Sequence, residues 1–496
     1  MVYEEWKHQD RRLIIAPAMK RCARPIGRVS GVASTRRFTP FSLSATLNPW
    51  TWGLGHPRHG ETETNSLLAG LLASGMPAAR NGACRSLEGA GMRNPVFLKR
   101  VVLNNYKSIK QCSVQLGALT FLVGQNGAGK SNFLDALRLV AESLNTSLEH
   151  ALRERGGIGE VRRRSSGHPT HFGVRLDWQL PDSTHGMYAF RVAAQKKGGF
   201  EVQQEDCQVF GSKLEEQHFY RIESGMTRKA SFSTGPAPSS DRLYLVAASG
   251  LSQFRPLYDA LMHMGFYNLN PDEIRDLQPP DAGEVLKRDG SNLASVLGAM
   301  EKERADAHEQ VVEFLSKVVP GIQGVTAKHI ARKETLEFRQ FVGNTSAPWR
   351  FVAENMSDGT LRALGVLTAL FQTWNGTSRR VPFVGIEEPE VAVHPGAAGV
   401  LRDALRASSA STQVAVTSHS PDLLDDKAIT NDSILVVVNR NGETEIGPLD
   451  EAGRTAIRDR LYTAGELLRL NQLGLDEKAA EKVTQSQLEL FADYSP

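Results

Sequence analysis

The stretch FLVGQNGAGKSNFLDAL, residues 121–137, constrains the fold of this chain more than any other part of the sequence. Gly124 is followed by four residues and then by the tripeptide 129–131, Gly-Lys-Ser. The apolar run 119–123 stands before this loop, and apolar residues with helical spacing stand after it. The pattern therefore predicts a strand, a glycine-rich turn and a helix start, which is the context that a phosphate-binding loop requires.

The residue types in this loop suit a phosphate ligand. Glycines let backbone N–H groups converge on phosphate oxygens, and the helix N-terminus adds a favourable dipole. Lys130 would reach the β- and γ-phosphates, and the Ser131 hydroxyl would ligate Mg²⁺. The alternative, a plain glycine turn, is disfavoured by the full match in its context. The predicted ATP-binding residues are Gly124, Asn126, Gly127, Gly129, Lys130, Ser131 and Asn132.

Composition sets the wider bounds. The chain has 496 residues, of which 41% are hydrophobic and 23% charged, so it has room for more than one domain of an ordinary globular protein. No apolar run approaches the length needed to cross a bilayer. The four cysteines lack paired metal-ligand spacing, which favours reduced thiols and a cytoplasmic location.

Residues 1–91 differ from the rest of the chain. They hold twelve Lys and Arg against six acids and have no sustained period of 2 or 3.6, so we expect them to be largely disordered. The segment could be a basic arm for nucleic acid, an organelle transit peptide, or sequence upstream of the true start. We favour the last interpretation, because Met92 would be a natural beginning for the folded unit.

The region between the loop and residue 320 predicts strands and one helix. The lead-in 96–123 reads as an antiparallel pair of strands followed by the nucleotide-binding strand. Alternating apolar residues over 172–180, and again over 188–192, predict strands of an antiparallel sheet. A helical spacing begins near Ser291 and predicts a packing helix that extends to Val318.

An arginine-rich segment, RERGGIGEVRRRSS, follows the loop helix. Two interpretations are open: contacts with phosphates of a nucleotide or of DNA, or a solvated face. Its arginines are Arg153, Arg155, Arg162, Arg163 and Arg164.

Two carboxylates, Glu387 and Glu388, follow the apolar run 381–386, which has the length of a buried central strand. Ligands of an open parallel sheet bind at the carboxyl ends of its strands. Adjacent side chains on an extended chain point in different directions, so one carboxylate can face Mg²⁺ while the other faces the attacking water. A solvated strand end is the alternative, which the phosphate loop makes less favoured.

Two further predicted elements have polar residues that could contact the phosphates of a nucleotide. His419 ends the predicted core strand in QVAVTSHS, so it is either a γ-phosphate contact or an ordinary packed or surface histidine. Ser357 and Gly359 precede a helix with an apolar face, where a plain N-cap is the simpler interpretation. A capped helix start is also an anion site, and since one nucleotide already has its loop, we expect this end to meet the nucleotide of a second subunit.

Four motifs in this order, GQNGAGKSN, MSDGT, GIEEPE and TSHSPDLL, resemble those of the ABC-type ATPase heads of the RecF, SMC and OLD-like group, and most of all predicted RecF-like ATPases of bacteria. The resemblance covers roughly residues 96–470. It implies an α/β P-loop NTPase fold: an ABC-type head with a mixed central sheet, an antiparallel β lobe and a helical insertion lobe. The head would span 92–470, with the insertion at about 145–350 and a tail at 471–496.

The resemblance also implies roles. Gly124 to Ser131 would be the Walker A loop, and Ser357 with Gly359 would be the signature motif acting in trans on the partner's nucleotide. Glu387 would hold Mg²⁺ together with Ser131. Glu388 would be the general base and His419 the switch histidine, so these two are the catalytic candidates. Two such heads would sandwich ATP and separate after hydrolysis.

The signature departs from the family's common form at Met356, Asp358 and Thr360, and Asp358 would add negative charge near the expected γ-phosphate, which implies slow turnover. A long coiled-coil arm needs sustained heptads, and the sequence has none, so we expect no such arm. Only about 75 residues follow His419, predicted as a hairpin at 434–449 and a helix from Thr463, so we expect no nuclease domain of the OLD kind.

The leading hypothesis is an ATP-hydrolysing, ATP-dependent homodimer that couples its nucleotide state to DNA or to a DNA-processing partner in repair or maintenance. The alternative is a sensor or regulatory subunit of an anti-phage or toxin module, acting through a separate nuclease or effector protein. An ABC transporter motor is less favoured, because the motifs resemble the repair-type heads and this chain has no membrane segment.

Overall fold

The computed structural model describes residues 96–492, apart from residues 166, 168, 212–216, 344, 373–380 and 480–489. The predictions for residues 1–91 and for most of the tail at 471–496 lie outside the described residues. The strands are β1 Leu98–Tyr106, β2 Ile109–Gln115, β3 Leu119–Val123, β4 His171–Gln179, β5 His185–Ala194, β6 Phe200–Phe210, β7 Gln217–Glu223, β8 Met226–Ala230, β9 Gly265–Tyr267, β10 Ile322–Ile330, β11 Lys333–Gln340, β12 Trp349–Val352, β13 Phe383–Glu387, β14 Gln413–Ser418, β15 Ile434–Arg440 and β16 Glu443–Pro448. The α-helices are α1 Lys130–Asn145, α2 Leu148–Arg153, α3 Ile158–Val161, α4 Tyr244–Ala248, α5 Arg255–Met262, α6 Pro271–Arg275, α7 Leu293–Glu303, α8 Ala305–Val318, α9 Asp358–Phe371, α10 Ala398–Ser409, α11 Pro421–Leu424, α12 Glu451–Arg458 and α13 Ala464–Arg469.

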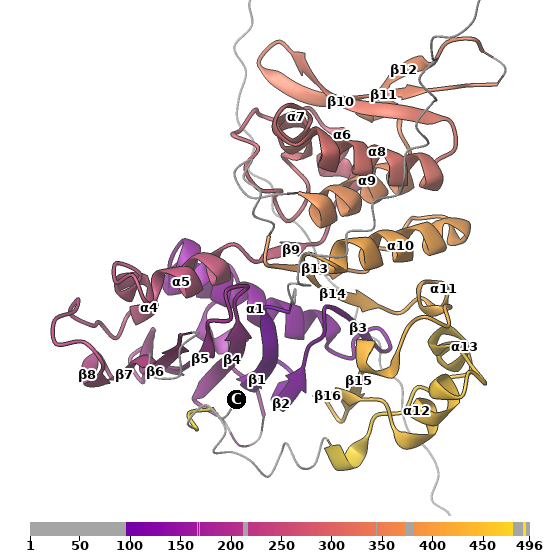
Figure 1. Cartoon of the computed structure of the whole chain (residues 1–496). Helices are drawn as coiled ribbons and strands as arrows, with labels where there is room; N and C mark the ends of the chain where they lie inside the picture. The colour runs from indigo at the N-terminus through magenta and orange to yellow at the C-terminus, as the bar shows by residue number, and fades with distance from the viewer. Residues whose placement is uncertain are drawn as a thin grey trace, which may run out of the picture. The chain divides into compact units, whose positions relative to one another are not determined.

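One large mixed sheet runs through the described part of the chain. Its strand order is β8-β7-β6-β5-β4-β1-β2-β16-β15-β3-β14-β13-β9. The strands from β8 to β2 pair antiparallel, whereas β15, β3, β14, β13 and β9 pair parallel. A separate antiparallel sheet, β10-β11-β12, lies beside α7 and α8 (Figure 1). The predicted α/β class, with a mixed central sheet, an antiparallel β lobe and a helical lobe, is confirmed.

The parallel half of the large sheet is covered on both faces, which explains its continuous apolar runs. Along β3, Leu122 packs into a core that includes the apolar face of α1. Its neighbours Phe121 and Val123 point to the other face and pack into a second core with α9 and α10. Successive strand residues face opposite ways, so an entirely apolar strand is required when both faces are buried.

The register of the parallel strands brings their carboxyl ends to one edge. Val123 of β3 lies opposite Ser418 of β14, and Thr417 of β14 lies opposite Glu387 of β13. The residues that follow these three strands therefore emerge side by side, and this alignment places the candidate site.

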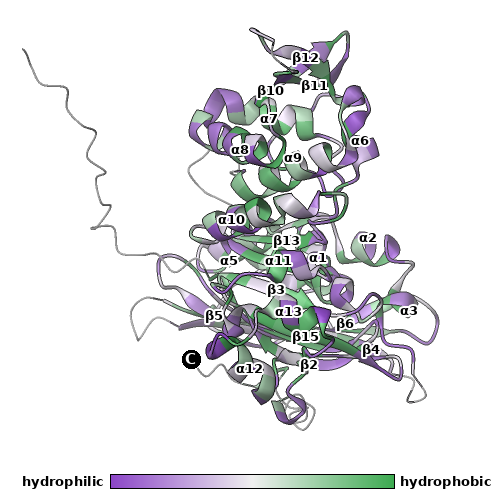
Figure 2. Cartoon of the chain, turned by 90° about the vertical axis from the view of Figure 1, so that its right-hand side faces the viewer, coloured by the Kyte–Doolittle hydropathy of each residue, from purple (hydrophilic) through white to green (hydrophobic). Residues whose placement is uncertain are grey.

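The helical lobe differs from the sequence prediction in one detail. The helix predicted from Ser291 to Val318 is two helices, α7 and α8, which meet at Arg304. Arg304 has φ −140° and ψ 63°, outside the helical region, so the chain turns there and both helices can place apolar faces against α9 and the small sheet (Figures 1 and 2). A continuous helical period in the sequence cannot reveal such a turn.

The antiparallel half contains the predicted strands but is buried more fully than alternation suggests. In β4, the apolar residues from Phe172 to Trp178 are buried, and so are Arg175 and Asp177 on the opposite face. Arg175 Nε donates to Asp177 Oδ1 at 2.8 Å, and Arg175 Nη1 donates to the carbonyl of Ala492 at 2.7 Å. A salt-bridged pair beneath the C-terminal residues therefore takes the place of the solvated face that alternation predicts.

The predicted hairpin is confirmed as β15 and β16, with Asn441 and Gly442 at its turn, both at positive φ. The predicted helix near Thr463 is α13, which Thr463 caps through a capping box with Glu466. Within the described residues, the helices are too short or too polar to cross a bilayer.

Candidate functional site

The glycine loop connects β3 to α1 at the carboxyl edge of the parallel strands. Gly127 and Gly129 have φ of 78° and 106°, conformations that glycine adopts without strain. A Cβ added at Gly129 would lie 2.1 Å from Thr444 Oγ1 on β16. Thr444 in turn donates to the carbonyl of Ala128 at 2.8 Å, so the hairpin braces the loop from behind. Asn126, with its neighbours at the tip of the loop, is exposed.

Lys130 lies across the loop rather than out in solvent. Its Nζ donates to the carbonyls of Gly124 at 2.7 Å and Gln125 at 3.2 Å, and its side chain is only 5% exposed. Burial lowers the pKa of the Lys130 ammonium, while the carboxylates of Glu388 and Glu390 act in the opposite direction. The ammonium is thus held at the centre of the loop, with a carboxylate, Glu388 Oε1, 4.0 Å away.

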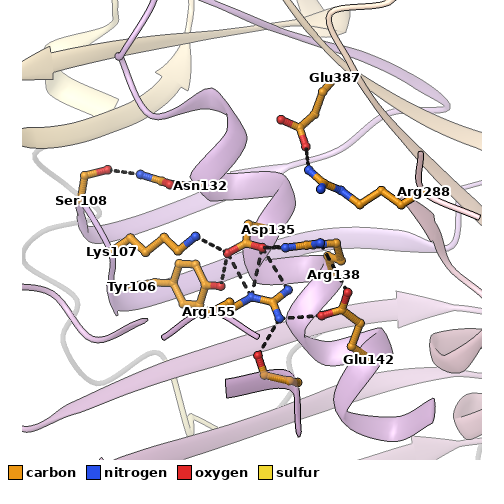
Figure 3. A network of polar contacts seen from close by, with 11 residues as sticks. Tyr106, Lys107, Ser108, Asn132, Asp135, Arg138, Glu142, Arg155, Arg288 and Glu387 are labelled. Atoms are coloured by element: carbon orange, nitrogen blue, oxygen red, sulfur yellow. Dashed lines mark hydrogen bonds and ion pairs between the residues drawn. The ribbon is translucent and has the colours of Figure 1, made fainter. Parts of the chain in front are cut away.

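The two other predicted loop residues lie at the start of α1. Ser131 is exposed. Asn132 Nδ2 donates to Ser108 Oγ at 2.6 Å (Figure 3). Ser108 Oγ in turn lies 2.7 Å from Thr444 Oγ1. The amide of Asn132 therefore fixes the helix start to the β2 side of the sheet.

Glu387 and Glu388 emerge from β13 next to this loop, and they point to different partners. Glu387 Oε1 accepts from Arg288 Nη2 at 2.8 Å (Figure 3). Glu388 has φ of 45°, a left-handed conformation that is uncommon outside glycine, and its N–H donates to the Thr417 carbonyl at 3.0 Å. Glu388 Oε1 lies 3.2 Å from His419 Nδ1.

The structure therefore brings three of the predicted elements together. Lys130, Glu388 and His419 form a chain of contacts in which the carboxylate stands between the ammonium and the imidazole. Glu387 stands next to Glu388 at the end of the same strand.

The signature residues lie at the start of α9, apart from this chain of contacts. Ser357 caps the helix by accepting from the Thr360 N–H at 3.3 Å. A Cβ added at Gly359 would lie 2.3 Å from the carbonyl oxygen of Ala392, so the helix start packs tightly on the segment after Glu388. Within the described residues, no hydrogen bond or ion pair joins Ser357 or Gly359 to residues 124–131. The acid that was expected to add charge here, Asp358, is paired with Arg275.

Comparisons with known proteins agree with this geometry. The family described as "AAA ATPase domain" matches residues 97–219, which include the glycine loop. The family described as "AAA domain, putative AbiEii toxin, Type IV TA system" matches residues 239–425, which include Ser357, Glu387, Glu388 and His419. Two AAA ATPase family models thus match different parts of the chain, and the site residues predicted from the sequence lie within the matched segments.

Solved structures similar to this chain include SMC heads. One is an Smc head bound to the C-winged helix domain of ScpA, with 14% identity and a TM-score of 0.46 over 72% of this chain and 99% of that chain. Another is an Smc head with an extended coiled coil, bound to the C-terminal domain of ScpA and derived from Pyrococcus furiosus, with 12% identity and a TM-score of 0.45 over 74% of this chain and 99% of that chain. The SMC head domain from Thermotoga maritima has 14% identity and a TM-score of 0.38 over 71% of this chain and 99% of that chain. No curated protein is a significant sequence match.

This edge of the sheet has a third carboxylate, Glu390, which the sequence reasoning missed. Its Oε1 accepts from Ser418 Oγ at 2.7 Å and from the His419 N–H at 3.3 Å. Its side chain is 10% exposed, and among the described residues its Oε2 is buried without a donor. Glu390 therefore fixes the backbone on which His419 stands. The third acid in EEPE, two residues after Glu388, was the available signal.

Arg362 was missed as well. It is 7% exposed and sits on α9, five residues after Ser357. Its guanidinium donates to the carbonyls of Leu269, of Glu387 at 3.2 Å and of Glu388 at 3.1 Å. Burial lowers the pKa of Arg362, opposed by the nearby glutamates. One side chain thus ties the signature helix to the backbone of both carboxylates. A lone arginine in the apolar run LRALGVLTALF was the signal for a buried charge.

A buried ion-pair network lies behind the loop helix (Figure 3). Asp135 of α1 accepts from Tyr106 Oη at 2.8 Å and from Arg155 Nε at 3.1 Å, and it also pairs with Lys107 and Arg138. Burial alone would raise the pKa of Asp135, but the surrounding cations outweigh it and hold this pKa well below the usual range.

The structure divides the arginine-rich segment. The side chains of Arg155 and Arg163 are largely buried in ion pairs, whereas Arg153 and Arg164 are exposed, as the solvated-face interpretation expects. The pairs are Arg153 with His150, Arg155 with Asp135 and Glu142, Arg162 with the Pro169 carbonyl, Arg163 with Glu443, and Arg164 with Glu160.

Proposed function

We propose that this ATPase head binds ATP with Mg²⁺ in the loop 124–131 and hydrolyses it in an ATP-dependent homodimer that acts on DNA or on a DNA-processing partner. The observation that carries the proposal is the chain of contacts from Lys130 through Glu388 to His419. It lies at the sheet edge where β13 and β14 end beside the glycine loop. Such an edge is where open parallel sheets bind their ligands.

In this proposal Lys130 moves from loop carbonyls to phosphate oxygens. Its ammonium now satisfies two carbonyls, which are weaker partners than a charged phosphate. The N–H groups at the start of α1 and in the loop would surround the same phosphates.

The residues present fit Mg²⁺. Mg²⁺ prefers oxygen ligands and usually takes one or two from protein carboxylates or hydroxyls, with phosphates and waters completing its shell. Ser131 and Glu387 would hold the ion, which neutralises charge on the transferred phosphoryl group when bound.

Glu388 is the proposed general base. Its carboxylate would orient a water and accept its proton as the water oxygen bonds to the γ-phosphorus and the bond to the ADP oxygen breaks. His419 would hold the carboxylate through Nδ1 and contact the γ-phosphate through the other ring nitrogen. Glu390 and Arg362 would act as positioning residues for these two groups.

The position of the signature residues supports the proposed dimer, since within the described residues no hydrogen bond or ion pair joins Ser357 or Gly359 to residues 124–131. In the proposed dimer, Ser357 and Gly359 meet the nucleotide of the partner subunit. Arg362 on the same helix donates to the carbonyls of Glu387 and Glu388. A movement of this helix on contact with the partner's nucleotide would therefore shift the two carboxylates of the same subunit.

Replacing Lys130 by alanine tests the nucleotide site. A charge-assisted hydrogen bond contributes about 1.5–3 kcal/mol, so ATP binding should weaken by about 10- to 100-fold. Titration calorimetry with ATP and Mg²⁺ would measure this, with Lys317→Ala, an exposed lysine of α8, as the matched control. Unchanged ATP affinity in Lys130→Ala would remove the loop from the proposal.

Replacing Arg288 by alanine tests the assignment of Glu387 to Mg²⁺. Arg288 now occupies the carboxylate that the ion would use, so its removal should lower the Mg²⁺ concentration for half-maximal ATP turnover. The ion pair is partly exposed and therefore worth at most about 1 kcal/mol, which corresponds to a shift of up to about fivefold. A Mg²⁺ titration beside the exposed control Arg458→Ala would show it. A higher Mg²⁺ requirement would mean that Arg288 supports the site instead of competing for it.

A second candidate function rests on the family match over residues 239–425, whose description names a toxin of a type IV system. In that case ATP binding would control a separate nuclease or other effector in a defence or toxin module. Slow turnover with tight nucleotide retention, and co-purification of a nuclease, would favour this function over a DNA-coupled motor.

A further inference from the structure

The small sheet β10-β11-β12 has one face turned away from the core. In an antiparallel pair, directly opposed residues share a face. Leu336 and Phe338 of β11 are buried in the core with α7 and α8, so the alternate residues Lys333, Glu337 and Arg339 belong to the other face. We call this second face, with its partners in register on β10 and β12, the outer face.

The outer face is strongly basic. The segment 322–352 contains five Lys and Arg but only two acids, and one of these, Glu334, is buried and accepts from Ser295 Oγ at 2.6 Å. The other acid, Glu337, is shared by Lys328 and Arg350, which pair with its two carboxylate oxygens. The basic residues on the strands are Lys328, Lys333, Arg339 and Arg350, and Arg332 lies in the turn between β10 and β11.

Two arginines of this face stand directly opposite each other. Arg339 and Arg350 are register partners on neighbouring strands, and Arg350 pairs with Glu337 at 3.0 Å. On its other side Arg339 faces Gly324, where an added Cβ would lie 2.6 Å from Arg339 Nη2, so the guanidinium lies across the bare glycine. Within the described residues no acid forms an ion pair with Arg339 or Arg332.

The surroundings of the sheet have the opposite charge. The helices α7 and α8, on the buried side of the sheet, carry five acids against two lysines. The basic charge of this lobe therefore lies on the outer face, where a polyanion laid along the strands would meet it.

We propose that the outer face of β10–β12 binds the phosphate backbone of a DNA duplex. The proposal rests on the proposed function, whose DNA partner it assigns to a surface. The donors are guanidinium and ammonium groups that match phosphate oxygens, and the charge of Arg339 is not compensated by any acid among the described residues. Binding through phosphates predicts little dependence on base sequence.

The test measures binding of a labelled duplex of mixed sequence to the full chain by fluorescence anisotropy over a range of salt concentrations. If four side chains neutralise phosphates, the slope of log K against log salt should be about −3.6. The double variant Arg339→Ala/Arg350→Ala should lose about half of that slope and bind at least about tenfold more weakly at low salt. The control Arg242→Ala/Arg458→Ala removes the same charge from exposed sites elsewhere.

Equal losses in variant and control would overturn the proposal, because the binding would then follow net charge alone. Displacement of the duplex by polyglutamate at equal charge concentration would also overturn it, in favour of an acidic protein partner. The melting temperature of Arg339→Ala/Arg350→Ala should change little, since both arginines are exposed and the ion pair of Arg350 with Glu337 lies near the surface; a large fall would mean that the arginines are structural. The assay requires no ATP turnover, so failure of the proposed hydrolysis leaves its outcome readable.

Discussion

Replacing Glu388 by glutamine should reduce ATP turnover by at least about 100-fold while ATP remains bound, because a general base typically contributes about 10²- to 10⁴-fold. The amide has nearly the shape of the carboxylate but cannot accept the proton of the attacking water. The contact with His419 Nδ1 at 3.2 Å can persist through the amide oxygen. The backbone of Glu388 is held independently by Thr417 and Arg362, so the loop geometry should survive the change.

A variant that binds ATP but does not turn it over should also accumulate the proposed dimer. Light scattering with and without ATP would detect it, beside single-turnover measurements on the same preparation. Glu313→Gln, an exposed residue of α8, is the matched control and should behave as the unaltered chain. Turnover close to that of the control would show that another group is the base. If the variant loses turnover but remains a monomer in the presence of ATP, Glu388 would still be the general base, but the dimer would be wrong.

The parts of the site that the sequence predicted are those that depend on local pattern. A strand, a glycine turn and a helix start are encoded within about fifteen residues, and the structure has them as β3, the loop and α1. The acidic pair and His419 each follow an apolar run, and parallel pairing with aligned ends then brings them together. To predict that these residues meet, it was enough to assume that β3, β14 and β13 are neighbours in the sheet.

The parts that it missed depend on contacts between segments far apart. Arg362 reaches the carbonyls of residues 387 and 388 from a different element, and no spacing rule reports where a buried guanidinium points. The arginine-rich segment failed as a guide for the same reason. Its charge is visible in the sequence, but Arg155 is matched by Asp135 and Arg163 by Glu443, the latter hundreds of residues away. Charge density alone therefore did not distinguish a ligand surface from internal pairing.

Replacing Asp135 by alanine should destabilise the fold by about 3–5 kcal/mol, because removing one partner leaves buried cations uncompensated. Arg155 is nearly inaccessible and pairs with both Asp135 and Glu142, so it cannot move into solvent without disturbing α1. Thermal unfolding at pH 7 would measure the loss. Asp177→Ala, which removes a comparable buried acid from β4, is the matched control for damage that does not involve the loop helix.

The pH dependence separates the charge of Asp135 from its shape. Its pKa is depressed in the folded state, so its stabilisation is complete above the ordinary carboxyl pKa of about 3.9 and is lost as the pH falls toward the folded value. The difference in stability between the unaltered chain and Asp135→Asn should therefore be full at pH 7 and smaller at pH 3. An equal difference at both pH values would assign the effect to packing alone. Since Asp135 lies one helical turn after Ser131, the same variants should also bind ATP more weakly, because the loop depends on α1 for its position.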